Sequence, residues 1–150
     1  MSYTRIIYHL VFRTKYSVKA IPLEQAPELY RYIWGIIKNK KCFLYRINGM
    51  EDHVHILLEV HPSIALSDLV KSIKVASSKW MKESGLFPDF QGWGIKYCAL
   101  TYSIKEKETL INYIKNQQAH HRTETFQDEI HRLWKEGDFE DDIKWFWVDS

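Results

Sequence analysis

The chain has 150 residues, enough for one domain with a buried core, and 45% hydrophobic with 27% charged residues is ordinary for a soluble globular protein. The formal net charge is +2, so total charge does not indicate nucleic-acid binding. The charged residues among 1–48 are nevertheless mainly basic, and residues 124–150 are rich in acids. The sequence has no secretory leader and no apolar run of about 18 residues, so we expect a cytoplasmic protein without membrane contact. Cys42 and Cys98 form no disulfide or metal motif, which predicts core thiols in a reducing compartment.

The first part of the chain predicts three strands and a helix. Residues 4–16, TRIIYHLVFRTKY, are rich in β-branched and aromatic residues, which predicts a long strand. Residues 23–41 carry apolar side chains at helical spacing, and Pro27 fits the first turn of that helix. Residues 42–49 and 52–60 are predicted to pair as a hairpin, because the first of them ends in the turn signal Asn-Gly.

The second part predicts further helices around a fourth strand. Residues 63–84 have a helical apolar stripe that ends at a glycine, and residues 95–103 form a strand after a loop. Residues 105–126 predict a third helix, and residues 127–137 a short fourth helix before the aromatic tail 143–150.

The order of these elements, β-α-β-β-α-β, is that of the ferredoxin-like or RRM-like fold. It predicts an α+β protein with a four-stranded antiparallel sheet, two helices on one face and an additional C-terminal helix. The other face must be covered by the third helix, a partner chain or a ligand. We expect residues 1–150 to form a single domain, with residues from about 124 to 150 as an extension of it.

Two histidines begin the strand in EDHVHILLEV, residues 51–60. Side chains at positions i and i+2 of a strand point to the same face, so His53 and His55 stand side by side. Two neighbouring imidazoles can share a metal ion, or they can be two polar groups at a strand end. Imidazole binds many divalent metals, so the spacing alone does not identify the ion.

Tyr113 and Gln117 are four residues apart in the third predicted helix and therefore lie on the same side of it. A tyrosine beside an apolar stripe usually packs, and a glutamine within a helix is usually solvated. Both side chains are also candidates to complete a site with the histidine pair, because a metal needs further oxygen or nitrogen donors.

Several motifs occur together in a fixed order: YHLVFRTKY, INGMEDHVHILLEV, SDLVKSIKVASSKW, NYIKNQQAHHR and TFQDEIHRLWKEG. In this order they resemble the single-tyrosine HUH transposases, which are the insertion sequence 200/605 family and the related REP-associated tyrosine transposases. The resemblance extends over nearly the full chain. Its most specific part is the combination of His-x-His with Tyr-x-x-x-Gln.

The resemblance implies a DNA transposase, an endonuclease and strand transferase that cleaves and rejoins single-stranded DNA at the hairpin ends of an insertion sequence. Tyr113 would attack a backbone phosphorus and form a 5′-phosphotyrosine, which releases a 3′-OH. His53, His55 and Gln117 would bind Mg²⁺ or Mn²⁺. His120 and His121 rank second as ligands.

Asp52 precedes the histidine pair and could orient one of the two rings, although a role in the turn is favoured.

The resemblance also implies contacts with DNA and between subunits. It places Arg13 and Lys15 near hairpin or flanking DNA. On the second helix, Lys71, Lys74 and Lys82 form a basic stripe, which is either a solvated face or a track for phosphates. The family further implies a homodimer, with the Tyr113 helix exchanged between subunits in some members.

Two other functions remain open at this point. A non-catalytic RRM-like protein could bind single-stranded nucleic acid by stacking aromatic side chains, which make up 15% of the chain. That interpretation gives no reason for the His-x-His and Tyr-x-x-x-Gln motifs. A metal-dependent hydrolase could use the histidine pair to activate water. A covalent protein–DNA adduct would separate the transposase from both.

Overall fold

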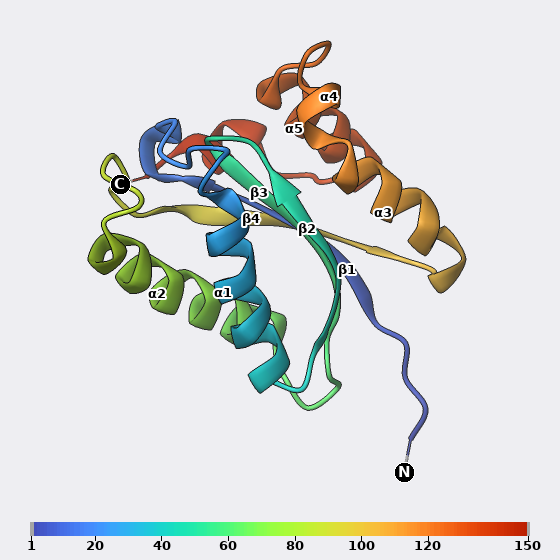
Figure 1. The fold of residues 1–150 in the computed structure, drawn as a ribbon. Coiled ribbons are helices and arrows are strands. Elements are labelled where there is room, and N and C mark those ends of the chain that lie inside the picture. The colour runs from blue at the N-terminus through green and yellow to red at the C-terminus, as the bar shows by residue number, and fades with distance from the viewer. Residues whose placement is uncertain (1, 150) are drawn as a thin grey trace.

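A four-stranded antiparallel sheet forms the centre of residues 2–149, the part of the chain that the computed structural model describes (Figure 1). Its strands stand in the order β2-β3-β1-β4. They are β1 (Ile7–Thr14), β2 (Phe43–Gly49), β3 (His53–Glu59) and β4 (Trp93–Tyr102). The predicted α+β fold class is confirmed, and the strand order is that of the ferredoxin-like arrangement.

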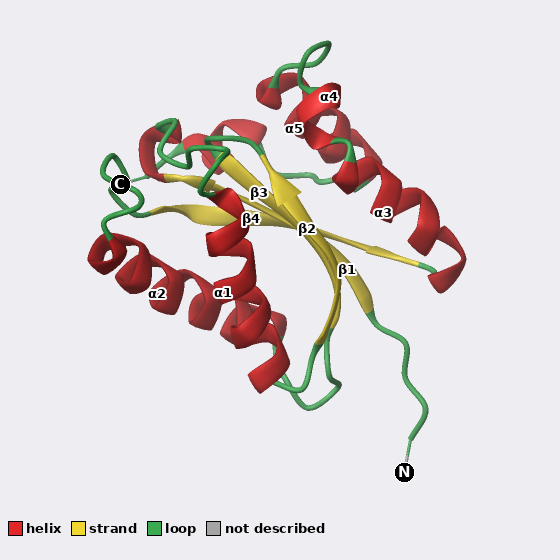
Figure 2. Cartoon of the chain, in the orientation of Figure 1, coloured by secondary structure: helices red, strands yellow, loops and turns green. Residues whose placement is uncertain are grey.

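Two helices, α1 (Ala26–Asn39) and α2 (Leu66–Ser84), pack together on one face of the sheet (Figure 2). Alternate strand residues such as Leu10 and Ile56 point to this face and pack with the apolar stripe of α1 in the larger hydrophobic core. Gly85 ends α2 with a φ of 76°, in the left-handed region that glycine adopts readily, as predicted.

The other face of the sheet is covered by the same chain. Here lie α3 (Lys107–Lys115), α4 (Gln117–His120), α5 (Phe126–Glu136) and the short 3-10 segment Ile143–Trp147 (Figure 1). The helix α3 packs Leu110 and Ile114 against Ile7 and Leu57 of the sheet. The helix α5 and the 3-10 segment pack on Val11 and Cys98 in a separate cluster.

The predicted third helix, residues 105–126, is wrong in its length. The structure interrupts it at Asn116, which has a φ of −98° and a ψ of 21° between α3 and α4. The side-chain amide of Asn48 donates to the carbonyls of Ile114 and Lys115, both at 3.1 Å. Side-chain hydrogen bonds of this kind offer backbone groups an alternative to the helical ladder.

Two smaller predictions concern cysteine and the membrane. Cys42 and Cys98 are both buried, free thiols. Within residues 2–149, the helices are too short or too polar to cross a lipid bilayer.

Candidate active site

The strand β3 brings His53 and His55 to the face of the sheet that α3, α4 and α5 cover. Both side chains are fully buried, and their ring centroids are 5.1 Å apart. The alternation of the strand explains this placement, because the intervening Val54 points into the opposite core. The predicted shared face of the two histidines is therefore present in the structure.

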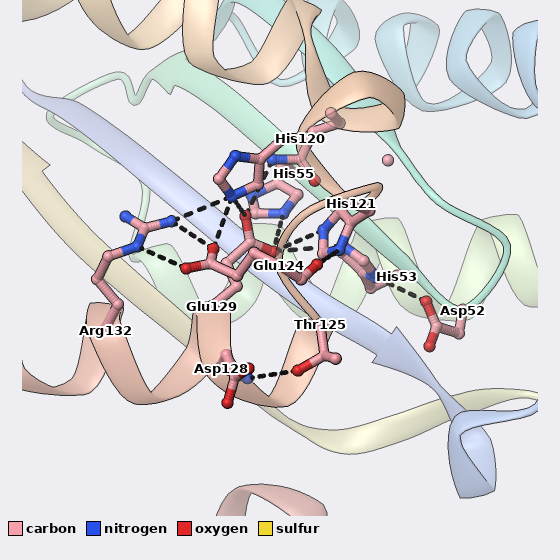
Figure 3. Close-up of polar contacts among 12 residues, drawn as sticks. Asp52, His53, His55, His120, His121, Glu124, Thr125, Asp128, Glu129 and Arg132 are labelled. Carbon is pink, nitrogen blue, oxygen red and sulfur yellow. Dashed lines mark hydrogen bonds and ion pairs between the residues drawn. The ribbon is translucent and has the colours of Figure 1, made fainter.

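Asp52 fixes the orientation and the tautomer of His53. Its carboxylate oxygen lies 2.7 Å from Nδ1 of His53 (Figure 3). A carboxylate accepts hydrogen bonds, so Nδ1 carries the hydrogen and Nε2 of a neutral ring has a free lone pair. That Nε2 is buried and has no hydrogen-bond partner among residues 2–149. Asp52 lies at a bend and also orients the imidazole. The orienting role, which the sequence analysis favoured less than a role in the turn, is therefore present.

His9 supports His55 from the neighbouring strand. The β1–β3 register places the two residues diagonally on the same face, and Nε2 of His9 lies 2.8 Å from Nδ1 of His55. Burial, followed by the proximity of His55, lowers the pKa of His9 to about 3. A neutral His9 can either donate or accept in this hydrogen bond. The sequence analysis did not identify His9. Its contact with His55 depends on the register between β1 and β3, which the sequence pattern does not give.

Tyr113 and Gln117 meet the histidine pair within one chain. The ring centroid of Tyr113 is 6.0 Å from that of His55, and the Gln117 side chain is fully buried. The amide nitrogen of Gln117 donates to Oε2 of Glu129 at 3.0 Å. Its amide oxygen is buried and has no hydrogen-bond partner in the described part of the chain. All four residues predicted for catalysis and metal binding thus lie together.

Glu129 of α5 is at the centre of the site and was missed by the sequence analysis. Its Oε1 lies 3.1 Å from Nε2 of His55, 3.1 Å from Nε2 of His121 and 3.5 Å from Nε2 of His53 (Figure 3). Its Oε2 accepts hydrogen bonds from Gln117 and from the Tyr113 hydroxyl. The side chain is fully buried.

The sequence does contain a signal for Glu129. The buried side of α5 consists of Phe126, Ile130 and Leu133, and Glu129 falls on the same side at helical spacing. An acid inside an apolar stripe requires a partner, because burying an unpaired carboxylate is costly.

The charges in the site are strongly coupled. Burial raises the pKa of Glu129, but the surrounding imidazoles, His55 foremost, lower it well below its usual range, so the carboxylate is ionised. Burial and the charge of Glu129 raise the pKa of Tyr113 above its usual range, which keeps the phenol protonated. Arg132 acts in the opposite direction, with Nη2 donating to the Tyr113 oxygen at 2.7 Å.

The comparisons with known proteins give the family. The family model described as "Transposase IS200 like" matches residues 2–117. ISDra2 transposase TnpA of Deinococcus radiodurans is 30% identical over 117 residues, which are 73% of this chain and 82% of that protein. The chain belongs to the IS200-like transposase family.

Two solved structures resemble this IS200-like transposase. A candidate transposase from Deinococcus radiodurans R1 superposes with a TM-score of 0.62 at 30% identity, over 77% of this chain and 93% of that chain. A REP-associated tyrosine transposase bound to a REP hairpin gives a TM-score of 0.61 over 95% of this chain and 90% of that chain. At 13% identity, the second likeness shows the fold alone. Family membership supports a DNA-cleaving, DNA-recombining protein.

The predicted DNA-binding residues of this IS200-like transposase are spread over both faces of the molecule. Arg13 is buried and forms an ion pair of 2.8 Å with Asp149. Nζ of Lys74 donates to the carbonyl of Gly94 at 2.9 Å, and burial, then the charge of Arg13, lowers the pKa of Lys74 to about 8. The exposed Lys71 and Lys82 belong to α2, across the sheet from the imidazoles.

Lys15 directly follows β1, at the end of the sheet where β3 begins with His53. Of the five basic residues predicted to bind DNA, it is the half-exposed one nearest to the histidine end of the sheet. Arg13 is bonded to Phe146 and Asp149 of the C-terminal segment, residues 138–149, so its contact with DNA would require that segment to move.

Proposed function

We propose that this IS200-like transposase cleaves and rejoins single-stranded DNA through a covalent intermediate on Tyr113. The observation that carries the proposal is the convergence of Tyr113, His53, His55 and Gln117 in one buried site. The hydroxyl of Tyr113 contacts the same carboxylate that the imidazoles surround. A structural tyrosine at the edge of a hydrophobic core would not need such surroundings.

The reaction is a transesterification. The Tyr113 oxygen forms a bond to phosphorus as the bond from phosphorus to the 3′-oxygen breaks, and the phenol proton leaves while the released 3′-oxygen gains one. The number of phosphodiester bonds is conserved, so a strand can be rejoined without another energy source. A phenolate is a better leaving group than a sugar alkoxide, so the reverse attack by a sugar hydroxyl is feasible.

We also propose that the site holds a divalent cation, Mg²⁺ or Mn²⁺, on His53, His55 and Gln117. The buried, unpartnered Nε2 of His53 and amide oxygen of Gln117, considered within residues 2–149, fit such a role. Such a cation supplies positive charge to the phosphate oxygens. The mixture of imidazole nitrogen and amide oxygen suits Mn²⁺ better than Mg²⁺.

The proposed substrate is single-stranded DNA with hairpin ends, bound with the help of Lys15, Lys71 and Lys82, and of Arg13 and Lys74 if the contacts that hold them release. The proposed assembly is a homodimer. The in-chain contacts of Tyr113 with Glu129 support sites that are each complete within one subunit.

The proposal is tested with labelled single-stranded oligonucleotides that cover imperfect palindromes flanking the coding sequence. With Mn²⁺, the wild-type protein is expected to form an adduct that survives denaturing electrophoresis. Tyr113→Phe should abolish this adduct and retain DNA binding, because it removes the nucleophilic oxygen and little else. Tyr102→Phe is the matched control, since the hydroxyl that it removes bonds to Glu136 and not to Glu129.

Other outcomes of this experiment would contradict the proposal. An adduct that persists in Tyr113→Phe would exclude Tyr113 as the nucleophile. Cleavage without an adduct would indicate a hydrolase that activates water. Binding with neither cleavage nor adduct would indicate the RRM-like binding protein.

A further inference from the structure

We propose that Glu129 and His121 bind the same cation as His53 and His55, so that α5 supplies an anionic ligand to the metal centre. The inference rests on the proposed function for the presence of that cation. Both added residues lie beyond residues 2–117, the part of the chain that matches the family model. They would therefore be a feature of this chain's C-terminal part.

The first argument is the spacing of the donor atoms. One nitrogen from each of His53, His55 and His121 and one oxygen of Glu129 all lie within 4.8 Å of one another. Ligands about 2.1 Å from a shared cation are roughly 3.0–3.4 Å apart in octahedral or tetrahedral geometry. The separations of 3.1, 3.1 and 3.5 Å between Glu129 Oε1 and the three nitrogens correspond to that spacing.

The second argument is the placement of hydrogens on the rings. Nδ1 of His121 lies 2.9 Å from the backbone carbonyl of Glu124, which can only accept, so this nitrogen carries the hydrogen. The same reasoning applies to His53 and Asp52. In the neutral rings, the remaining Nε2 atoms are acceptors that face the carboxylate of Glu129. Two acceptors facing each other in a buried site are unfavourable. Either a proton on Nε2 or a metal cation between the atoms relieves this, and a cation can satisfy all three nitrogens and the carboxylate at once.

His55 can join this arrangement because of His9. If the hydrogen of the His55 ring is on Nδ1 and Nε2 of His9 accepts it, Nε2 of His55 also has a free lone pair. The amide oxygen of Gln117 is a further buried acceptor that a cation could satisfy. It has no hydrogen-bond partner within residues 2–149, and the amide nitrogen of the same side chain is bonded to Glu129. Three imidazoles and a carboxylate form a donor set for a first-row divalent ion.

The test is the binding of Mn²⁺ to the metal-free protein without DNA, measured by calorimetry and by the electron paramagnetic resonance of the bound ion. Glu129→Gln keeps the shape of the side chain and removes its charge, and it should weaken Mn²⁺ binding by ~10–100-fold. His121→Gln should also weaken binding. Glu136→Gln, an exposed change on the same helix, is the matched control and should bind as the wild type does.

His53→Ala separates this inference from the proposed function. If Mn²⁺ binding is lost in His53→Ala but unchanged in both Glu129→Gln and His121→Gln, the inference is overturned and the proposed metal site stands. If binding in His53→Ala equals that of the wild type, the proposed metal site falls as well. Circular dichroism identifies any variant that does not fold. If Glu129→Gln does not fold, the Mn²⁺ affinity of His121→Gln decides the inference.

Discussion

At the scale of single residues, the site depends on side chains that hold the imidazoles as much as on the imidazoles themselves. Asp52 sets the tautomer of His53, and His9 contacts the far side of His55. Such partners determine which ring nitrogen is free for a metal. Their effect can be measured separately from that of the ligands.

Replacing Asp52 with alanine should weaken Mn²⁺ binding by ~10–100-fold, because His53 loses the acceptor that keeps Nε2 unprotonated and its ring in place. Calorimetry on the metal-free protein measures the change. The control is Glu51→Ala, since Asp52 and not this neighbouring acid is bonded to His53. An affinity for Asp52→Ala within twofold of the wild-type value would refute the positioning role.

Part of this site could be predicted from the sequence. The shared face of His53 and His55 followed from strand alternation alone. Their meeting with Tyr113 and Gln117 was an expectation from the family resemblance, since spacing within a helix does not say which strand it packs on. The contact of His9 with His55 depends on strand register, which no local pattern gives. The apolar stripe of α5 marks Glu129 as a buried acid, but its partners depend on how α5 docks.

At the scale of elements, the C-terminal segment is fastened to the end of the sheet. The guanidinium of Arg13 donates to Asp149 at 2.8 Å and to the carbonyl of Phe146 at 2.9 Å. Asp149 also accepts from the backbone N–H groups of Tyr16 and Ile95. Because both charged side chains are nearly inaccessible to solvent, removing one partner leaves the other buried and unpaired.

Asp149→Asn should therefore lower the free energy of unfolding by about 3 kcal/mol at pH 7. Burial raises the pKa of Asp149, but Arg13 and the two N–H donors lower it further, so the net shift is downward. A lowered pKa contributes stability above the unfolded value of about 3.9, and that contribution is lost as the pH falls through the folded value.

Urea unfolding of Asp149→Asn at pH 7 and near pH 3 measures both effects, and the difference from the wild type should shrink at the lower pH. Glu140→Gln, an exposed acid in the same segment, is the control. Equal stabilities of Asp149→Asn and the wild type at pH 7 would show that the ion pair does not hold the segment.

Some of the helices and strands could be predicted from the sequence pattern, and others could not. The four strands, α1 and α2 follow from alternation, helical stripes and a terminal glycine. The break at Asn116 does not, because it depends on Asn48, which is distant in sequence and bonds to the last carbonyls of α3. Tyr113 and Gln117 therefore lie on two helices, and both side chains contact Glu129.

At the scale of the whole molecule, one chain supplies both halves of the site. The sheet contributes the histidines, and α3, α4 and α5 contribute Tyr113, Gln117 and Glu129 (Figure 1). The family allows the alternative of an exchanged helix, in which a histidine pair would work with the tyrosine of the partner subunit. The contact between Tyr113 and its own chain's Glu129 favours complete sites in each subunit.

Co-expression of Tyr113→Phe and His53→Ala chains with different tags tests this arrangement. Neither chain has a complete site, so the mixed assembly should form no adduct, as each chain alone should not. Adduct on the His53→Ala chain of a mixed dimer would show that its tyrosine reaches the partner's histidines. Light scattering on the same sample reports whether a dimer forms.

The most direct measurement is the mass spectrometric identification of the residue that carries DNA after reaction with a single-stranded substrate. The account predicts a nucleotide remnant attached through a 5′-phosphate to the peptide that contains Tyr113. A remnant on any other residue, or cleavage products with no modified peptide, would contradict it.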